Sequence, residues 1–569
     1  MLAASSLLAA CGGGGDSPPQ AFLALAQAHS RRTALAATAV PASAGSDTSG
    51  LAGAGAVATV TELLDWAERA YPQYFPGHEA NLSLEPYIYR HYPGSGNYVG
   101  VAGSDVYVLG PIVPALDATL SADTLVLVGS LASFTPQVYA SRYAYSDAQA
   151  ARFLNQATLG ATDADIGSVR ALGYAAWLEA QFAQPPSPGN WDFLVAQGID
   201  VNPDAAAVAI GVDAQVWQRL MSAPDSLRQR VALALSEIFV VGFDGLSGPY
   251  KQFQLAGLWD LLAQNAFGSF RTLLEQVTLN PAMGVYLNTA GNQKEDPATG
   301  RQPDENYARE VMQLFTIGLY ELDPDGSVRH DDGVPRESYT QDMVSHLARV
   351  FTGWNVNRPR GSTGPAFVRT PMTLTAALHS TLESRFLGTT IAAGTDGTTA
   401  LRMALDTLAY HPNVGPFIGR QLIQRLVTSN PGPAYVARVS AAFADNGAGV
   451  RGDLQAVLRA VLLDEAARSD TGLADPQFGK LREPMLRLVQ WARAFKASSS
   501  SGAWNVGNTV DPGTRLGQSP QRSASVFNFF RPGYVPPNTA IATAALVAPE
   551  FQITNESSVA GYLNYMRTV

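Results

Sequence analysis

Two stretches of sixteen residues decide the fold class: PDENYAREVMQLFTIG at 303–318 and YTQDMVSHLARVFTGW at 339–354. In the first, Asp304 stands at a position typical of a helix N-cap, and Gly318 stands where helices commonly end. In the second, Thr340 can cap the helix. Apolar residues recur in both at intervals of three and four, which places them on one helix face. Both stretches therefore predict amphipathic helices that pack into a core.

The same periodicity continues through most of the chain. The predicted core faces of the two helices are Tyr307, Val311, Leu314 and Phe315, and Met343, Leu347, Val350 and Trp354. Helical spacing also marks the segments 150–159, 164–182, 214–221, 226–241, 255–279, 398–428, 433–446, 452–466 and 479–497. Strand-like runs are scarce among them, so the sequence predicts a large all-α domain over 146–569. Long polar connections, which are usually functional or disordered, stand at 288–304, 355–376 and 499–520.

The N-terminal part has a different composition. Residues 12–58 are mostly Gly, Ala, Ser, Thr and Pro with few large apolar side chains, which predicts a disordered tether. A helix is expected at 59–75, and three short β-rich runs separated by turn residues follow within 87–109. We therefore predict a small α+β module over 59–112 and a connecting segment over 113–145. The predicted fold class is mainly α, with a large multi-helix domain behind this module and the tether.

Cys11 is the single cysteine of the 569-residue chain. One cysteine can form neither an internal disulfide nor a multi-thiolate zinc or iron–sulfur site. The residues LAAC at 8–11, followed by Gly12, resemble a bacterial lipobox, so lipidation of Cys11 is expected. The preceding residues are few and lack Lys and Arg, unlike an ordinary signal peptide. An Ala-rich tail with a chance cysteine is the alternative.

Lipidation at Cys11 would determine the location of the protein. Residues 1–11 would then be the end of a signal segment, and the exported chain would face the periplasm or the cell surface. Gly12, in place of Asp, favours the outer membrane. No later run of about 18 apolar residues occurs, so the expected membrane contact is the lipid anchor alone.

Composition and motifs exclude several function classes. The 38 basic and 48 acidic residues give a net charge of −10, which argues against nucleic acid as a partner. The sequence contains no nucleophile elbow, no phosphate-binding glycine loop and no His-Glu-x-x-His run. We find no disulfide, thiolate-metal, nucleotide or haem signature, and the cofactor is left unknown.

Polar residues near the two decisive helices supply the candidate site. The candidates for acid–base chemistry are Glu305, Glu310, Asp342 and His411. The candidates for binding are Asn306, Arg309, Arg349 and Trp354. A carboxylate beside an arginine usually has a lowered pKa, which describes a structural pair better than a general base. Asp342 and His346 stand four apart and could share a metal ion, although the same spacing suits a surface ion pair.

Several stretches resemble the family called domain of unknown function 1800. Its two signatures are similar to DENYARE and LFTIG within 304–318, and to YTQD, AR and FTGW within 339–354. Further matching runs stand at 151–154, 411–412, 433–438, 452–454, 480–484, 525–530 and 549–551. The resemblance covers about 146–569 and implies a bacterial, mostly exported and uncharacterised protein. His346 departs from the acidic or other polar residue expected there, so a metal site at His346 would not be a family property.

Three interpretations remain open at this stage. The first is an envelope-tethered binding or assembly protein whose partner is another exported protein or an envelope polysaccharide. The second is an envelope hydrolase with a carboxylate/arginine site between the 303–318 and 340–354 helices. In the third, the motif forms a buried polar network between core helices, made of Asn306, Arg309, Glu310, Asp342 and Arg349.

Overall fold

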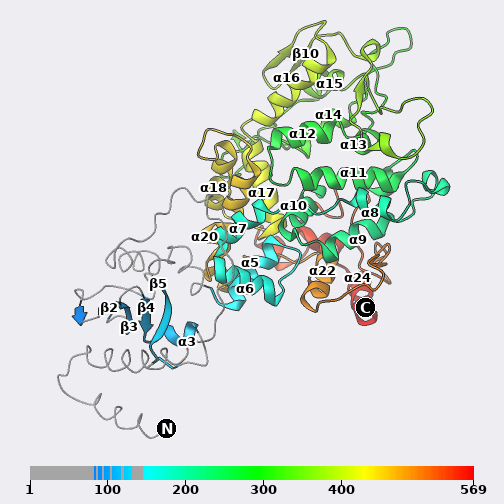
Figure 1. Ribbon diagram of the computed structural model, residues 1–569. Helices are drawn as coiled ribbons and strands as arrows, with labels where there is room; N and C mark the ends of the chain where they lie inside the picture. Colours follow the sequence, from blue (N-terminus) through cyan, green and yellow to red (C-terminus); the bar gives the residue numbers. More distant parts are fainter. Residues whose placement is uncertain are drawn as a thin grey trace. The chain divides into compact units, whose positions relative to one another are not determined.

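The computed structural model describes residues 82–84, 87–92, 95–102, 105–116, 121–122, 124–130 and 145–569 (Figure 1). Cys11, the tether predicted at 12–58 and the helix predicted at 59–75 lie outside the described residues. The chain divides into two compact units. The sheet unit holds the residues up to Ala150 together with Gly167–Ala176, and the helical unit holds Ala151–Ile166 and Trp177–Val569.

The sheet unit contains one antiparallel sheet whose strands follow one another in sequence order. The strands are β1 (Leu82–Leu84), β2 (Tyr87–Tyr92), β3 (Asn97–Ala102), β4 (Asp105–Leu109) and β5 (Val126–Ser130), and the helix α3 (Ile112–Leu116) follows β4. The three-run meander predicted within 87–109 is confirmed as β2 to β4. His91 and Tyr98 are partners in the β2–β3 register, and their rings stack at 4.3 Å. Aromatic cross-strand pairing therefore stabilises this sheet.

The rest of the described chain is mainly α, as predicted. Its helices are α5 (Asp147–Ala157), α6 (Asp163–Leu172), α7 (Tyr174–Ala183), α8 (Asn190–Ala196), α9 (Val212–Ser222), α10 (Ser226–Ser236), α11 (Lys251–Gln264), α12 (Phe270–Thr278), α13 (Pro281–Tyr286), α14 (Asn306–Gln313), α15 (Gln341–Val350), α16 (Gly397–Tyr410), α17 (Val414–Leu426), α18 (Pro433–Ala444), α19 (Leu454–Leu463), α20 (Glu465–Arg468), α21 (Thr471–Ala474), α22 (Pro484–Ala494), α23 (Ala540–Thr543) and α24 (Glu556–Thr568). Three small hairpins pair β6 (His330–Asp331) with β7 (Val334–Pro335), β8 (Trp354–Asn355) with β9 (Thr373–Leu374), and β10 (Ser384–Phe386) with β11 (Thr389–Ile391).

Some predicted helices are shorter or divided in the structure. The segment 398–428 forms two helices, because Pro412 has no N–H to donate and keeps His411 out of the helical conformation, at ψ 138°. The segment 255–279 is likewise divided, since α11 ends at Gln264 and a new helix begins at Phe270. Periodicity continues across both breaks in the sequence, so apolar spacing alone does not reveal them.

The decisive stretch 303–318 forms a shorter helix than predicted. Asp304 stands one residue before the N-cap, Glu305, and its Oδ1 accepts a hydrogen bond from the backbone N–H of Asn306 at 2.8 Å. The helix ends at Gln313, and Gly318 closes the following turn with φ +74°. A Cβ atom at Gly318 would lie 2.7 Å from the ring of Phe417, so glycine is required both by conformation and by space. At this turn the chain passes close to Phe417 of α17.

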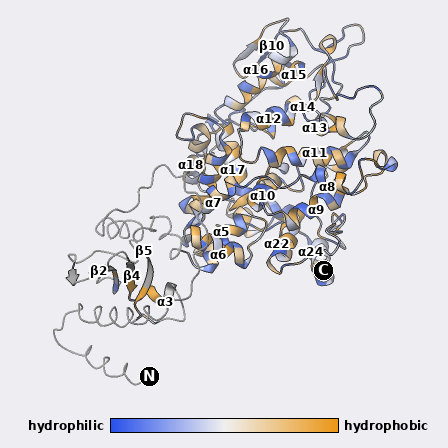
Figure 2. Cartoon of the chain, in the orientation of Figure 1, coloured by the Kyte–Doolittle hydropathy of each residue, from blue (hydrophilic) through white to orange (hydrophobic). Residues whose placement is uncertain are grey.

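The core of the helical unit surrounds α10. Figure 2 shows that the helices carry both hydrophobic and hydrophilic residues. α10 packs against α9, α11 and α17, and its residues from Ser226 to Leu235 are all buried (Figure 1). The indole of Trp259 on α11 is 1% exposed and donates to Gln229 Oε1 at 3.0 Å, so its polar atom is satisfied inside the core. Arg230 on α10 is also buried, at 1% exposure, so this helix carries a charged side chain into the core.

Candidate functional site

Glu305 joins the two helices that the sequence singled out. Its Oε1 accepts a hydrogen bond from Ser345 Oγ at 2.6 Å, and its Oε2 accepts from Gln341 Nε2 at 2.7 Å and Arg309 Nη2 at 3.1 Å. Partial burial alone would raise the pKa of Glu305, but the hydrogen bonds from Ser345 and Gln341 and the charge of Arg309 lower it. Glu305 is therefore a fixed anion that connects α14 to α15.

Glu310 differs from Glu305 although both flank Arg309. Glu310 is 7% exposed, and its Oε2 has no hydrogen-bond partner among the described residues. Burial raises its pKa, and Arg309 offsets this only in part. The lowered pKa expected for a carboxylate beside an arginine is thus present at Glu305 and absent at Glu310, because burial dominates at Glu310.

The remaining residues of the predicted polar network lie nearer the surface. The Asp342 side chain is 84% exposed, and its Oδ2 is 3.8 Å from His346 Nε2. Arg349 Nη1 donates to the carbonyl of Glu383, which precedes β10. A buried network is wrong for this set, because only one of its five members, Glu310, is buried.

The environments of Trp354 and His411 indicate structural roles. Trp354 is 6% exposed within β8, so its ring belongs to the core. His411 caps the C-terminus of α16, and its Nδ1 accepts the backbone N–H of Asn413 at 3.2 Å. Burial lowers the pKa of His411, which favours the neutral ring. Within the described chain, no hydrogen bond or ion pair joins any two of the candidates Glu305, Glu310, Asp342 and His411.

A cavity of about 490 Å³ lies beyond the C-terminal end of α14. We call it the α17 pocket, because residues of α17 form one of its walls. Its other walls come from 313–328 and from 526–533, and Glu237 and Ile238 complete it. The apolar lining residues are Ile238, Leu314, Leu319, Leu322, Val328, Phe417, Val526, Phe527 and Pro532.

Cationic and amide groups interrupt these apolar walls. Arg420 and Arg531 line the pocket, are exposed, and form no ion pair with any residue that the structure describes. Although the Arg420 side chain reaches the surface, partial desolvation lowers the pKa of its guanidinium, and no charged neighbour offsets this effect. The guanidinium of Arg531 lies 4.5 Å from the centre of the Phe527 ring, which holds it beside the pocket. Gln421 is 7% exposed, and its Nε2 has no partner in the described chain.

Glu237 and Arg425 form the buried end of the α17 pocket. Arg425 Nε lies 3.4 Å from Glu237 Oε2, and both side chains are at most 6% exposed. Burial raises the pKa of Glu237 well above its ordinary value, and the neighbouring carboxyl of Glu483 raises it further. Burial alone would raise the pKa of Glu483, but a hydrogen bond from Glu237 and the charge of Lys480 lower it. Burial and the neighbouring carboxyl therefore shift the pKa of Glu237 upward, while the pKa of Glu483 is lowered.

A larger charge cluster extends from this pair into the core. Its members are Arg230, Glu237, Arg425, Lys480, Arg482, Glu483 and Glu550. Lys480 Nζ lies 2.8 Å from Glu550 Oε1, and Gln518 Nε2 donates to Glu483 Oε2 at 2.7 Å. The cluster has four cations for three carboxyl groups, so cations are in excess next to the α17 pocket. That charge favours an anion at the buried end of the pocket.

The sequence indicated only part of this site. The stretches 314–318 and 525–530 were singled out, and both line the α17 pocket. The stretches 480–484 and 549–551 were singled out as well, and they contribute Lys480, Arg482, Glu483 and Glu550 to the cluster. Glu237, Arg420 and Arg425 were missed. A usable signal was present for two of them, because Glu237 and Arg425 interrupt strongly apolar helical segments.

Two negative findings apply to the described residues. No group of three or more His, Cys, Asp or Glu side chains there could hold a metal ion. No helix there is long and apolar enough to cross a bilayer.

Comparison with known proteins gives one match. The family described as "Protein of unknown function (DUF1800)" matches residues 152–567, which is most of the chain and includes every residue of the α17 pocket and the charge cluster. No curated protein and no solved structure matches.

Proposed function

The chain belongs to the DUF1800 family, whose description names no activity, and we propose from its own geometry that it is a binding protein for an acidic, largely apolar molecule. The ligand would occupy the α17 pocket. The observation that carries the proposal is that two arginines, Arg420 and Arg531, line a mostly apolar cavity and have no ion-pair partner among the described residues.

Size and lining support a small ligand. Pockets for small molecules commonly measure about 300–1,000 Å³ and combine apolar walls with a few polar groups. The α17 pocket has about 490 Å³, and side chains such as Phe417 and Phe527 form its walls. An apolar chain or ring that leaves water for these walls gains roughly 25 cal/mol per Å² of buried surface.

Charge supports an acidic group on that ligand. Arg420 and Arg531 have no anionic partner in the described chain, and Arg425 is engaged with Glu237. A carboxylate or phosphate would provide the missing partner and could accept two hydrogen bonds from one guanidinium. Gln421 Nε2 is a further donor without a partner.

The pocket lining favours binding over hydrolysis. None of the described residues that line the α17 pocket is Ser, Thr, Cys, His or Lys, and its one carboxyl, Glu237, is paired with Arg425. The alternative, a hydrolase with its site between the 303–318 and 340–354 helices, stays a prediction. Glu305 does not favour it, because its hydrogen bonds hold it as a charged structural group.

We further propose that the protein works at the cell envelope, exported and attached to the outer membrane by a lipid on Cys11. The lipobox-like residues 8–12 support this location. An exported partner protein or an envelope polysaccharide is proposed as the companion of the helical body. Labelling of cells with a palmitate analogue tests the anchor: the wild-type protein is expected to be labelled and Cys11→Ser is not, and a labelled Cys11→Ser protein would contradict it.

The binding proposal is tested with three probes of equal chain length. Dodecanoate, 1-dodecanol and dodecyltrimethylammonium are titrated into the full chain by calorimetry. Dodecanoate is expected to bind about 10- to 100-fold more tightly than dodecanol, because a hydrogen bond to a charged group contributes about 1.5–3 kcal/mol. The cationic probe is expected to bind most weakly.

Variants locate the binding. Arg420→Met with Arg531→Met is expected to reduce the affinity for dodecanoate to that for dodecanol. Arg360→Met is the matched control, because Arg360 is an exposed arginine outside the pocket, and it should leave binding unchanged. Equal affinity for all three probes, or equal affinity of the double variant and the control, would overturn the proposal.

A further inference from the structure

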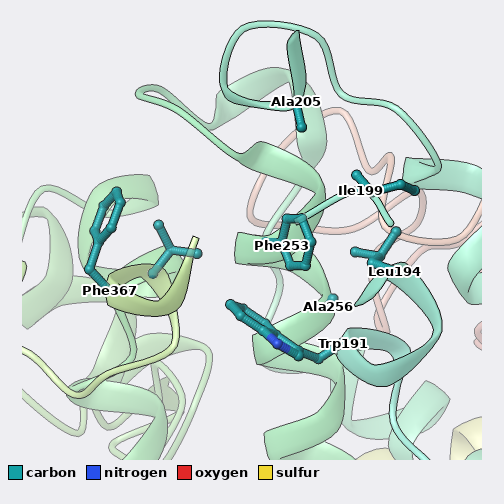
Figure 3. Close-up of a cluster of buried hydrophobic side chains, with 8 residues drawn as sticks. Trp191, Leu194, Ile199, Ala205, Phe253, Ala256 and Phe367 are labelled. Atoms are coloured by element: carbon teal, nitrogen blue, oxygen red, sulfur yellow. The ribbon is translucent and has the colours of Figure 1, made fainter. Parts of the chain in front are cut away.

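A second cavity, of about 840 Å³, lies among α8, α9, α11 and the C-terminal end of α12. We call it the polar hollow. None of the stretches that carry the family resemblance lines it. Trp191 belongs both to its lining and to a hydrophobic cluster with Leu194, Phe253 and Phe367 (Figure 3). One wall of the hollow therefore packs against a buried hydrophobic cluster.

Amide groups without protein partners face this hollow. Asn280 is 3% exposed, and its Oδ1 caps α13 by accepting the backbone N–H of Ala282 at 2.9 Å, while its Nδ2 bonds to no described residue. The Gln264 side chain is exposed and has no hydrogen bond within the described chain. Gln276 Oε1 accepts from Asn265 Nδ2 at 2.7 Å, which leaves Gln276 Nε2 free.

Two carboxylates that line the hollow differ in how many of their oxygens accept a hydrogen bond: both oxygens of Asp260 do, but only one of Asp192. Asp260 accepts the backbone N–H groups of Asn190 at 2.7 Å and Trp191 at 3.0 Å, so both of its oxygens serve the start of α8. Asp192 Oδ2 accepts the N–H of Gly189 at 2.8 Å, and its Oδ1 has no partner in the described chain. Free acceptors therefore stand among the free amide donors.

Arg369 adds a donor and closes the aromatic face. Its guanidinium lies 4.4 Å from the centre of the Trp191 ring and forms no ion pair with a described residue. Phe253 packs edge-on against the same indole at 4.7 Å. Trp191 is thus covered by its neighbours, and hydrogen bonds would dominate recognition in the hollow.

The segment 184–189, at the rim of the hollow, has a conformationally restricted backbone. The segment 184–189 reads QPPSPG, and proline restricts its backbone. Ser187 is tied to Asp225 through its backbone N–H at 3.1 Å and also through its hydroxyl. A Cβ at Gly189 would lie 2.4 Å from Asp260 Oδ2, so this segment passes close against α11. A preformed rim lowers the entropy that binding would otherwise cost.

A neighbouring hollow extends the surface. It measures about 640 Å³ and shares with the first the six lining residues Pro186, Ser187, Pro188, Gly189, Asp192 and Arg219. The two hollows thus meet at the proline-rich segment, and a ligand longer than one unit could contact both.

We infer that the polar hollow binds a neutral, hydroxyl-rich chain of the oligosaccharide type. Each sugar hydroxyl donates one hydrogen bond and accepts others, which matches free amide donors beside free carboxylate acceptors. The charged lining residues are Asp192, Asp260 and Glu275 against Arg219 and Arg369, so neither sign dominates as it does in the α17 pocket. The site is separate from the α17 pocket, and the inference rests on the envelope polysaccharide proposed above as a companion of the helical body.

Trisaccharides test this inference. Cellotriose, maltotriose and N,N′,N″-triacetylchitotriose are titrated against the full chain, with binding followed by ligand-observed NMR and calorimetry. At least one is expected to bind. Gln264→Leu combined with Gln276→Leu should weaken that binding at least tenfold, because two of the free amides are removed.

The controls separate this site from folding and from the α17 pocket. Gln477→Leu removes an exposed amide elsewhere and should leave sugar affinity unchanged. Dodecanoate affinity and thermal midpoint should also stay unchanged in the double variant, which shows that the loss is local. Absence of binding for all three sugars, or an equal effect of the control and the double variant, would overturn the inference whatever the result with dodecanoate.

Discussion

The α14–α15 surface and the charge cluster around α10 contain the same side-chain types in opposite environments. Glu305 and Arg309 form an ion pair at 3.1 Å with about a third of each side chain exposed. Glu237 and Arg425 form one at 3.4 Å with at most 6% exposed. The pKa of Glu305 is lowered, whereas burial raises that of Glu237. Burial, rather than the identity of the pair, decides whether the pKa of the carboxyl is raised or lowered.

The largest expected effect comes from breaking the buried pair. Arg425→Met should lower the free energy of unfolding by about 3–5 kcal/mol, because it leaves the buried Glu237 carboxyl without the cation that pairs with it. Arg309→Met, the matched change at the surface, should cost less than about 1 kcal/mol. Urea unfolding of both variants measures the difference.

A second change sharpens the interpretation of that result. Glu237→Gln in the Arg425→Met chain is expected to recover part of the lost stability, because it removes a carboxyl that has lost its counter-ion. Equal losses from Arg425→Met and Arg309→Met would show that burial does not distinguish the two pairs.

Asp260 is an intermediate case. Burial raises its pKa from 3.8 to about 6, although two backbone N–H groups act in the opposite direction. Since the folded-state pKa lies above the unfolded one, its contribution to stability is greatest below about pH 4 and declines as the pH rises to about 6, by up to roughly 3 kcal/mol. Asp260→Asn removes this dependence. As the pH rises from about 4 to about 6, the unfolding free energy of the wild type should therefore fall relative to that of the variant. A constant difference would contradict the raised pKa.

The smallest expected effect belongs to Glu305, and it has the opposite sign. Its lowered pKa means that its contribution is present above the unfolded value of 4.5 and is lost as the pH falls. Glu305→Gln should therefore be destabilising by about 0.5–1 kcal/mol at pH 7 and nearly neutral at pH 3. Thermal unfolding at the two pH values measures this, and a larger loss at pH 3 than at pH 7 would refute it.

The same comparison explains what the sequence could and could not predict. Local patterns predicted that helices occupy most of 146–569, but they placed the start of α14 one residue too early, at Asp304, and its end too late, at Gly318. Helix breaks such as the one between Gln264 and Phe270 were missed, because apolar spacing continues across them. Hydrophobic periodicity identifies the buried face of a helix but not the element that packs against it.

The candidate site was harder to predict for the same reason. Polar residues on the exposed faces of α14 and α15 were prominent in the sequence, yet most of them stay near the surface. The residues of the α17 pocket and its charge cluster come from segments as distant as Glu237 and Arg531, and only tertiary packing brings them together. Family-like stretches marked several of these segments without showing that they meet.

The wide sequence separation of the charge cluster has a consequence for synthesis. Arg230 on α10 is made early, but Glu483 and Glu550, which compensate its charge, leave the ribosome some 250 and 320 residues later. Until then Glu237 is the only one of the three carboxyl neighbours of Arg230 that has been made, so the charge cluster is complete only when the last segments have been added. A chain terminated before Pro549 would lack Glu550 and would leave Lys480 without its buried ion-pair partner.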